Sequence, residues 1–345
     1  LKGNIKFIYY DLPRWVLVIK KRLSIVRFYY FLWQYFASLK LKKILQKQDF
    51  DILHHLTFVS LRHFSHLGNF GKPLVLGPLA GGDSSPRWIR RYISWKFLIS
   101  EYLRDLLNIF TKYDPFFQQS LKSSEIIICS TSETQRIIPN KFRSKSKLIN
   151  QLYMEKPKKI DFYRKRNSKN ILFVGRFISY KGMDIGLESF AFALKKDKSL
   201  KLTMVGEGSK KEKWQLKAKN LGISNSIKWL PYMSQDKLNM IYLKNSIFLF
   251  PSLHDSGGKV LFEAISRGLR VITLNIGGPS LIINNKVGKL IEVKNSNRDK
   301  LINDIAESIL EFAACEYESH EIYRRAAAHY EDWKISKVID KVGIY

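Results

Sequence analysis

Residues 251–278 read PSLHDSGGKVLFEAISRGLRVITLNIGG and combine two acids, a pair of glycines and an apolar run. The two acids, Asp255 and Glu263, lie too far apart along the chain to be neighbours on one helix face, where contacts fall three or four residues apart. The pattern predicts a strand at Ile247–Phe250, a loop that carries Asp255, and a helix that begins near Gly258 and holds Glu263 about one turn in. Such a unit is typical of a parallel α/β sheet.

The glycine turn and the helix start suit an anionic ligand. Glycines let the backbone approach a ligand closely, and the free N–H groups and positive dipole end of a helix favour a diphosphate. Asp255 is then expected on the sugar side of the site, and Glu263 within reach of a ribose diol. Two other interpretations remain open, Asp255 as a helix cap and Glu263 as an ion-pair partner of Arg267. The backbone amides expected to contact phosphate are those of Gly257, Gly258, Lys259 and Val260.

Three ordered motifs give this chain a resemblance to a known family. Ile171–Gly182 is an apolar strand followed by Gly-Arg and Lys-Gly, Met204–Gly208 ends in a G-x-G turn, and Asp255 with Glu263 fits a D/E-x7-E signature. In this order they resemble the retaining glycosyltransferases of family 4 (glycosyl transferases group 1), which have the GT-B fold. Members of that family usually carry Glu where this chain has Asp255.

The resemblance implies both a fold and an activity. The fold is α/β, with two doubly wound Rossmann-like domains that face each other across a cleft. The activity is transfer of a sugar from a nucleoside diphosphate sugar to a saccharide or lipid-linked acceptor, in polysaccharide or lipopolysaccharide biosynthesis. No cofactor or metal is implied, and no His, Cys and carboxylate cluster with metal-ligand spacing is present. The residues that the resemblance makes catalytic are Arg176 and Lys181, which hold the diphosphate, and Asp255.

Further donor-binding candidates come from the same motifs. Gly175 precedes Arg176, and Gly206 and Gly208 form the G-x-G turn, although these two fit a plain strand-to-helix turn equally well. By position, the base pocket is expected along Leu230–Met233, at Tyr232. In the first half of the chain, candidates for the acceptor side follow two predicted strands. They are His54, His55, Gly81 and Gly82, and a histidine there can equally be a hydrogen-bonded core residue.

Short apolar runs alternate with helical patterns along the whole chain, which predicts parallel α/β units. Long helices are expected at Phe28–Gln46 and Pro86–Leu121. Strands of the first half are expected at Ile5–Tyr10, Asp51–His55, Pro73–Gly77, Glu125–Cys129 and Lys147–Gln151. Strands of the second half are expected at Asn170–Val174, Lys201–Val205, Ser226–Trp229, Ile247–Phe250 and Arg270–Thr273.

A polar, lysine-rich stretch divides the chain. The predicted parts are an acceptor-side Rossmann-like domain at 1–155, a linker at 156–169, a nucleotide-sugar-binding Rossmann-like domain at 170–325, and a closing helix at 326–345 that returns to the first domain. The sequence opens with Leu1, and Asp11-Leu-Pro13 follows the first predicted strand directly. Compared with the family, we expect a leading βαβ portion to be missing.

The charge of the chain is extreme, with 59 Lys and Arg against 30 Asp and Glu, a net +29. Such a field favours anionic partners. No zinc-finger spacing, RNA-recognition motif or helix-turn-helix pattern is present, which argues against nucleic acid and for an anionic membrane surface. Pro86–Lys96 and Arg14–Arg27 interleave basic and aromatic residues. This predicts either lipid contact through Arg87, Arg90, Arg91 and Lys96, or helices that bury their aromatic side chains.

The remaining sequence features concern the compartment and the rival functions. Phe28–Leu39, an uncharged stretch, is shorter than the roughly 18 apolar residues that span a bilayer. With two cysteines and no signal peptide, we expect a cytoplasmic protein that is peripheral at the inner face of the membrane. Two other functions remain open: a sugar-nucleotide epimerase of similar fold, and a non-catalytic truncated homologue.

Overall fold

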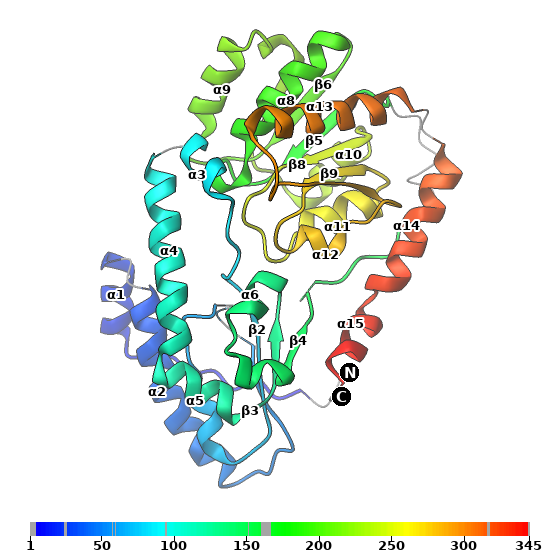
Figure 1. The fold of residues 1–345 in the computed structure, drawn as a ribbon. Helices are drawn as coiled ribbons and strands as arrows, with labels where there is room; N and C mark the ends of the chain where they lie inside the picture. The colour runs from blue at the N-terminus through cyan, green and yellow to red at the C-terminus, as the bar shows by residue number, and fades with distance from the viewer. Residues whose placement is uncertain are drawn as a thin grey trace.

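The structure, a computed structural model, contains two parallel sheets, one in each half of the chain (Figure 1). The two sheets lie one above the other in the view of Figure 1, with helices packed around each of them. The predicted α/β class with two separate sheets is therefore confirmed. The structure describes residues 5–23, 26–56, 58, 60–93, 95–150, 152–159, 167–315 and 318–343.

The sheet of the second half has six parallel strands in the order β10-β9-β8-β5-β6-β7. The edge strand β10 (Gly288–Ile291) was not predicted, because Lys289 and a half-buried pattern weaken its apolar signal. The central strands β5 and β8 are continuous apolar runs, as expected for strands buried on both faces. Five strands match the prediction to within a residue or so: β5 (Asn170–Val174), β6 (Lys201–Val205), β7 (Ile227–Leu230), β8 (Ile247–Phe250) and β9 (Arg270–Leu274).

Helices connect the strands of this second sheet. The short 3-10 helix η3 (Ser179–Lys181) follows β5 and leads through Gly182 into the first of them. The longest, α13, packs against α8 (Figure 1). The helices are α8 (Met183–Lys196), α9 (Lys211–Asn220), α10 (Gln235–Tyr242), α11 (Lys259–Ser266), α12 (Pro279–Ile282) and α13 (Arg298–Ala314).

The sheet of the first half has four parallel strands in the order β1-β2-β3-β4. They are β1 (Leu53–His55), β2 (Leu74–Leu79), β3 (Ser124–Cys129) and β4 (Ser146–Leu148).

The predicted strand at Ile5–Tyr10 is wrong, because residues 5–10 form no regular structure. The carbonyls of Tyr9 and Tyr10 accept hydrogen bonds from the side chains of Lys40 and Trp33, both on α2 (Val26–Leu45). Side chains of a helix thus satisfy backbone groups that a strand would pair with a neighbouring strand.

The predicted helix at Pro86–Leu121 is three helices, α3 (Arg87–Ile93), α4 (Trp95–Tyr113) and α5 (Pro115–Ser123). The Asp114 carboxylate accepts hydrogen bonds from the amides of Phe116 and Phe117 at 2.8 and 3.2 Å, and Pro115 follows it. Asp as cap with Pro in the first helical position is a strong start signal, so a new helix begins there. The other helices of this half are α1 (Arg14–Leu23), η1 (His66–Phe70), α6 (Ser132–Ile137) and η2 (Asn140–Lys145).

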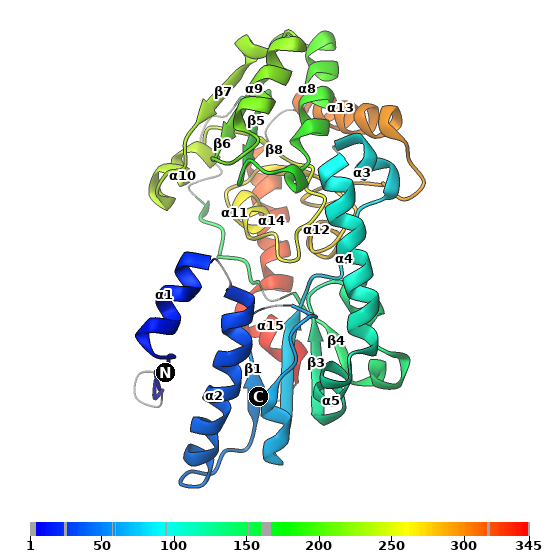
Figure 2. The ribbon, with the colours of Figure 1, turned by 90° about the vertical axis from the view of Figure 1, so that its left-hand side faces the viewer.

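Helix α3 belongs to the first half by sequence but packs on the second half. Ile89, Ile93 and Phe97 are buried in the same apolar core as β5 and β8. The Lys213 ammonium on α9 also donates to the carbonyl of Ile93 at 3.5 Å. Figures 1 and 2 both show α3 at the level of α8, well away from β2 and β3. The chain therefore crosses between the domains at α3, long before the linker.

The chain returns to the first sheet through α14 (Ser319–Trp333) and α15 (Ile335–Val342). The Trp333 carbonyl accepts a hydrogen bond from the amide of Met154 at 2.9 Å. Val338 then packs against the cluster of Val75, Ile128 and Ile149 in the first sheet. In Figure 1, the red C-terminal helices run from the second sheet down to the first.

One buried residue of α14 makes stability sensitive to mild acid. His329 is 2% exposed beside Phe262 and Trp333, and neither ring nitrogen has a hydrogen-bond partner among the described residues. Burial lowers the pKa of His329 from 6.5 to about 4, with Asp332 raising it and Lys286 lowering it. Because the pKa of His329 is lower in the folded protein than in the unfolded chain, the neutral ring leaves stability at its full value above pH 6.5. The free energy of unfolding then decreases as the pH falls from 6.5 through 4.

We therefore expect the unfolding free energy to fall by roughly 1–3 kcal/mol between pH 6.5 and 4.5 because of His329. Urea unfolding at several pH values measures this. His329→Phe should flatten the dependence, whereas His320→Gln, a change at an exposed histidine of the same helix, should leave it as in the wild type. Equal pH dependence in the wild type and His329→Phe would show that this histidine does not control acid stability.

Candidate functional site

The loops that follow β5 and β8 meet at the carboxyl ends of these strands. Leu253 N donates to the Tyr180 carbonyl at 2.8 Å, and Ser252 Oγ lies 3.3 Å from the same oxygen. Gly182, with φ +71°, lies so close to the Pro251 carbonyl that an added Cβ would be 1.8 Å from its oxygen. The Lys181-Gly182 turn and the loop of Asp255 are thus held together by backbone contacts that only glycine permits.

At this meeting point, Lys181 and Asp255 form a close ion pair. Nζ of Lys181 lies 2.6 Å from Oδ2 of Asp255, and the two side chains are 14% and 17% exposed. The other carboxylate oxygen, Oδ1, accepts hydrogen bonds from the amides of Gly257 and Gly258 at 3.2 and 2.7 Å. Both amides precede α11, which begins at Lys259 with Gly258 as its cap residue and has no side-chain cap, so the helix-cap alternative for Asp255 is wrong and its contact with a donor sugar stays a prediction.

Helix α11 begins directly after the loop of Asp255, and the contact of its first amides with phosphate stays a prediction. Gly258 adopts φ +72° and precedes the helix, and its carbonyl accepts from Leu261 N at 2.9 Å. The amides of Lys259 and Val260 come before this bond, where helix N–H groups have no intrahelical partner. Arg176, in the loop after β5, is exposed, and within the described part of the chain its side chain makes no hydrogen bond or ion pair.

Glu263 lies one turn into α11 and is 12% exposed. Its Oε2 accepts a hydrogen bond from the Tyr242 hydroxyl at 3.1 Å, and Oε1 is 3.8 Å from the Lys259 ammonium. Arg267, the alternative partner, instead donates to the Glu263 carbonyl at 3.2 Å and lies 3.7 Å from Glu155. Burial, followed by the nearby Glu263 charge, raises the pKa of Tyr242, so its hydroxyl stays protonated and donates to Glu263.

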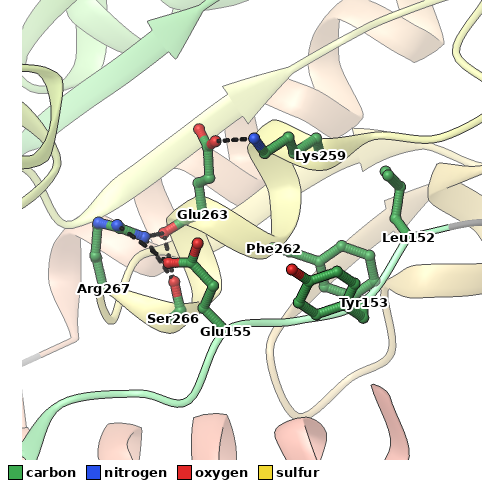
Figure 3. Close-up of a pocket in the computed structure, with 8 residues that line it drawn as sticks. All are labelled: Leu152, Tyr153, Glu155, Lys259, Phe262, Glu263, Ser266 and Arg267. Carbon is green, nitrogen blue, oxygen red and sulfur yellow. Dashed lines mark hydrogen bonds and ion pairs between the residues drawn. The ribbon is translucent and has the colours of Figure 1, made fainter. Parts of the chain in front are cut away.

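A pocket of about 230 Å³ lies beside Glu263 (Figure 3). One wall is α11, and the opposite wall is the segment that leaves the first domain, with Tyr153 facing Phe262. It therefore brings two carboxylates, two cations and two aromatic rings together at the junction of the domains. The lining residues are Leu152, Tyr153, Glu155, Lys259, Phe262, Glu263, Ser266 and Arg267.

The glycines of the G-x-G turn have packing reasons of their own. A Cβ on Gly206 would lie 1.9 Å from the Gly175 carbonyl oxygen, and one on Gly208 would lie 2.4 Å from that of Phe177. Both have positive φ, at +146° and +152°. They therefore shape the turn against the β5 loop, and Tyr232, 82% exposed, is not among the residues that line the pocket at Glu263.

Of the two residue pairs predicted for the acceptor side, only Gly81 and Gly82 lie near the loop of Asp255. Gly82 packs on α6, where an added Cβ would be 2.5 Å from Thr134 Cα. The next residue, Asp83, is buried, and its carboxylate would lie 3.6 Å from a Cβ on Gly277 of the second domain. Gly278 N donates to the Asp255 carbonyl at 2.7 Å. Gly81–Asp83 thus approaches the Asp255 loop through the Gly277-Gly278 turn.

The histidine pair lies elsewhere. His54 Nε2 is 3.0 Å from the Gly77 carbonyl, and burial lowers the pKa of His54. His55 Nε2 is 2.8 Å from the Tyr30 hydroxyl, and burial lowers the pKa of His55 to about 4. Both line a groove of about 350 Å³ along α2, and no residue of the second domain lines it. Their acceptor role stays a prediction, and the structure shows hydrogen-bonded histidines in a separate groove.

Residues that the sequence did not single out join the two domains at the Asp255 loop. His254 Nε2 lies 2.7 Å from the Glu101 carboxylate, and Nδ1 lies 3.0 Å from Nη1 of Arg104. Asn150 donates to the carbonyls of Ser256 and Gly257 at 3.4 and 3.3 Å. The sequence could have indicated His254, since it lies inside the motif beside Asp255. No sequence pattern indicated Glu101 and Arg104, because they lie in a helix rich in apolar residues.

The residues of this site lie in a part of the chain that resembles known proteins. A family profile described as "Glycosyl transferases group 1" matches residues 155–329. The chain belongs to this family. The matched span holds the β5 loop, the G-x-G turn, the Asp255 loop and α11. Among the described residues, no group of three or more His, Cys, Asp or Glu is placed to hold a metal ion.

Two curated relatives of this glycosyltransferase family member have similar sequences. An uncharacterized glycosyltransferase of Haemophilus influenzae is 31% identical over 147 residues, which is 41% of each chain. An uncharacterized glycosyltransferase of Methanocaldococcus jannaschii is 28% identical over 174 residues, 49% of this chain and 44% of the relative. The chain thus spans less than half the length of the curated relatives that it matches.

Solved structures confirm the GT-B fold of this family member. The lipopolysaccharide outer core galactosyltransferase WaaB superposes with a TM-score of 0.60 at 14% identity, over 91% of this chain and 79% of that one. Anabaena Alr3699/HepE in complex with UDP and glucose gives 0.55 at 14% identity, over 88% and 79%. At these identities the likeness concerns the fold alone.

Proposed function

We propose that this family member is a retaining glycosyltransferase that moves a sugar from a nucleoside diphosphate sugar to a saccharide or lipid-linked acceptor. One observation carries the proposal: Lys181 pairs with Asp255 on the loop that leads into α11, Gly258 N donates to the same carboxylate, and Arg176 in the loop after β5 is exposed. We infer that Lys181, Arg176 and the first amides of α11 hold the diphosphate, since cations and free helix N–H groups suit such an anion.

The chemistry follows from these groups. When a glycosyl bond to diphosphate breaks, positive charge develops on the sugar and negative charge on the departing phosphate oxygens. Lys181, Arg176 and the amides of α11 stabilise the leaving group through fixed positive charge and dipoles. In the protein without ligand, Asp255 neutralises Lys181, and a bound diphosphate supplies the anion instead. Asp255 is then available to accept hydrogen bonds from the donor sugar.

Relatives support a nucleotide-sugar donor. The HepE structure contains UDP and glucose, and a structure of TarM of S. aureus contains UDP and alpha-GlcNAc-glycerol, with a TM-score of 0.55 at 21% identity over 66% of this chain and 46% of that one. The WaaB and WaaG structures belong to glycosyltransferases of lipopolysaccharide synthesis. We therefore propose the same chemical class of donor here, and surface polysaccharide or lipopolysaccharide as the product.

The test is a two-step assay with purified protein. Thermal unfolding with UDP, GDP or ADP identifies the base, since a ligand at 100 times its Kd stabilises by about 2.7 kcal/mol. Transfer from the matching sugar nucleotide is then measured with and without saccharide acceptors. Conversion of the sugar nucleotide without an acceptor would indicate an epimerase. Nucleotide binding without transfer to any acceptor would indicate a non-catalytic homologue.

Glu263→Gln tests the ribose assignment. A carboxylate accepts hydrogen bonds at both oxygens, whereas an amide accepts at one, and Tyr242 already donates to Glu263. We expect nucleotide affinity to fall about tenfold or more, with little change in folding. Calorimetric titration of UDP or GDP measures it, and Glu155→Gln, on the opposite wall of the pocket, is the control. Normal nucleotide affinity with a much lower melting temperature would make Glu263 a structural residue.

We further propose that this enzyme works on an anionic membrane surface, at the inner face of the membrane. Helix α4 carries the argument, because it faces its polar side inward and its apolar side outward. Glu101, Asn108 and Thr111 are buried. The exposed side chains of the helix include Trp95, Ile99, Leu103, Leu106, Ile109, Phe110 and Tyr113. No helix in the described part of the chain is long and apolar enough to span a bilayer.

The membrane surface predicted from the sequence needs one correction. Arg90 is 2% exposed, pairs with Asp105 at 2.7 Å and donates to the Ser85 carbonyl at 2.7 Å. It therefore cannot face lipid. Arg87 on α3 and Lys96 in the first turn of α4 are exposed, while the side chain of Arg91 lies outside the described residues. An amphipathic surface with cations at its edge is typical of monotopic membrane contact.

Sedimentation with vesicles tests this surface. Changing Ile99, Leu103, Leu106 and Phe110 to Ser should abolish the part of vesicle binding that resists salt, because apolar insertion is lost. Changing Arg87 and Lys96 to Gln should remove about 1 kcal/mol each of attraction to anionic lipid, and only at low salt. Phe192→Ser with Leu216→Ser, at exposed positions of the second domain, is the control. Unchanged binding in the α4 variant would refute the lipid surface.

A further inference from the structure

The inner face of α4 holds charged groups at the loop that carries Asp255. Glu101 is 4% exposed and accepts hydrogen bonds from Ser85 Oγ at 2.9 Å and from His254 at 2.7 Å. Arg104 lies 3.5 Å from the same carboxylate, and its Nη2 donates to the Asp83 carbonyl. Because His254 is on the second domain and the others are on the first, these contacts join the domains directly.

The geometry fixes the tautomer of His254. A guanidinium only donates hydrogen bonds, so Nδ1 of His254 must accept from Arg104. Nε2 then carries the hydrogen and donates to Glu101. The ring has one hydrogen bond to each partner. Protein groups therefore use both of its nitrogens.

The carboxylate at the end of this bridge is ionised at neutral pH. Burial acts to raise the pKa of Glu101, but its interactions with His254, the charge of Arg104 and the hydrogen bond from Ser85 together lower it. The imidazole of His254 lies between the Arg104 guanidinium, whose side chain is 21% exposed, and the buried Glu101 carboxylate, and it is within hydrogen-bond distance of both. Removal of Arg104, His254 or Glu101 alone is therefore expected to lower stability while the other two remain.

The bridge acts on the residue next to the ion pair of the donor site. His254 precedes Asp255 directly, and the Ser252 hydroxyl lies between its carbonyl, at 3.2 Å, and that of Tyr180, at 3.3 Å, either of which can accept its one hydrogen. Tyr180, which precedes Lys181, places its ring 6.2 Å from the His254 ring. Asn150 holds the far side of the loop at Ser256 and Gly257. The loop of Asp255 is consequently held between two groups of the first domain.

We propose that Arg104, His254 and Glu101 form an interdomain bridge that positions the Asp255 loop against the first domain, so that a bound donor faces the acceptor side. All three are positioning residues, because they act through Asp255 and Lys181. The diphosphate contacts come from the second domain alone. Loss of the bridge should therefore lower turnover and leave nucleotide binding in place. The inference rests on the proposed function for the identity of the donor.

Two substitutions at His254 separate hydrogen bonding from bulk. Gln offers an acceptor oxygen and a donor nitrogen, and so can keep one bond to Arg104 and one to Glu101, whereas Phe keeps the ring without either bond. We expect His254→Phe to lower turnover about tenfold or more and His254→Gln by a few-fold. Both variants should keep thermal protection by UDP or GDP. Equal losses in the two variants, or loss of nucleotide protection in both, would overturn the positioning role.

A distance measurement tests the bridge without any activity. Spin labels at Gln119→Cys on α5 and Lys219→Cys on α9 report on the separation of the domains, in a Cys315→Ser background where the remaining Cys129 is buried. His254→Phe should broaden the distance distribution or shift it to longer values, and His254→Gln should resemble the wild type. Identical distributions in all three proteins would refute the bridge. If the distances respond but no transfer is found with any donor, the proposed function fails and the bridge stands.

Discussion

Lys181→Ala is expected to lower turnover about tenfold to a hundredfold and to weaken nucleotide binding in parallel. A charge-assisted contact to phosphate contributes roughly 1.5–3 kcal/mol, and the side chain of Lys181 is only 14% exposed. The substitution also leaves Asp255 without its partner at 2.6 Å. Protection of the protein by UDP or GDP against thermal unfolding should therefore disappear or nearly so.

Thermal unfolding and steady-state kinetics measure this effect. Arg176→Ala is expected to act in the same direction but to spare stability, because the Arg176 side chain is exposed. Lys198→Ala, a change at an exposed lysine in the turn before β6, is the matched control and should behave as the wild type. Full nucleotide protection in both Lys181→Ala and Arg176→Ala would refute the diphosphate assignment.

Gly182→Ala is expected to destabilise the protein by roughly 3 kcal/mol or more and to abolish nucleotide protection. Its φ of +71° costs a non-glycine residue about 1–2 kcal/mol, and the new Cβ would lie 1.8 Å from the Pro251 carbonyl oxygen. Relief of that overlap adds roughly 1–3 kcal/mol. Because Gly182 follows Lys181 directly, any shift of the turn also moves the ammonium away from Asp255.

A second glycine of the same domain supplies the matched control. Gly222 has nearly the same φ, +69°, but nothing lies within 4 Å of an added Cβ. Gly222→Ala should therefore cost only the backbone strain, about 1–2 kcal/mol, and should keep nucleotide protection. Urea unfolding of both variants isolates the effect of the Pro251 contact. Equal destabilisation in the two variants would show that the turn relaxes without loss.

The second domain could be predicted from sequence because its strands are buried on both faces. Runs such as Ile247–Phe250 carry an apolar signal that no competing pattern shares, so strand boundaries agree closely with the structure. The glycine turns and the order of motifs likewise located Lys181, Asp255 and the start of α11 together. Their pairing was not predicted, since an ion pair 74 residues apart in sequence depends on how two loops fold against each other.

The first domain was harder to predict because its helix α4 buries polar side chains. Periodicity locates the apolar face of a helix but assumes that this face is buried, and in α4 Glu101 and Asn108 are buried instead. The prediction of lipid contact for Arg90 failed because Arg90 is buried and paired with Asp105, a contact that no local pattern reveals. At Ile5–Tyr10 an apolar run predicted a strand, but strand formation requires a neighbour, which a local pattern cannot reveal.

The crossing at α3 bears on protein engineering. Exchanging donor halves between related enzymes is one route to new sugar specificity, and the linker after Met154 is the obvious place to join two genes. A junction there would separate Ile89, Ile93 and Phe97 from the core in which they are buried. Each such side chain contributes about 1.5–3 kcal/mol when fully buried, so a hybrid joined at the linker would begin with an incompatible interface. A hybrid that carries residues 87–97 together with the donor half would keep that core whole.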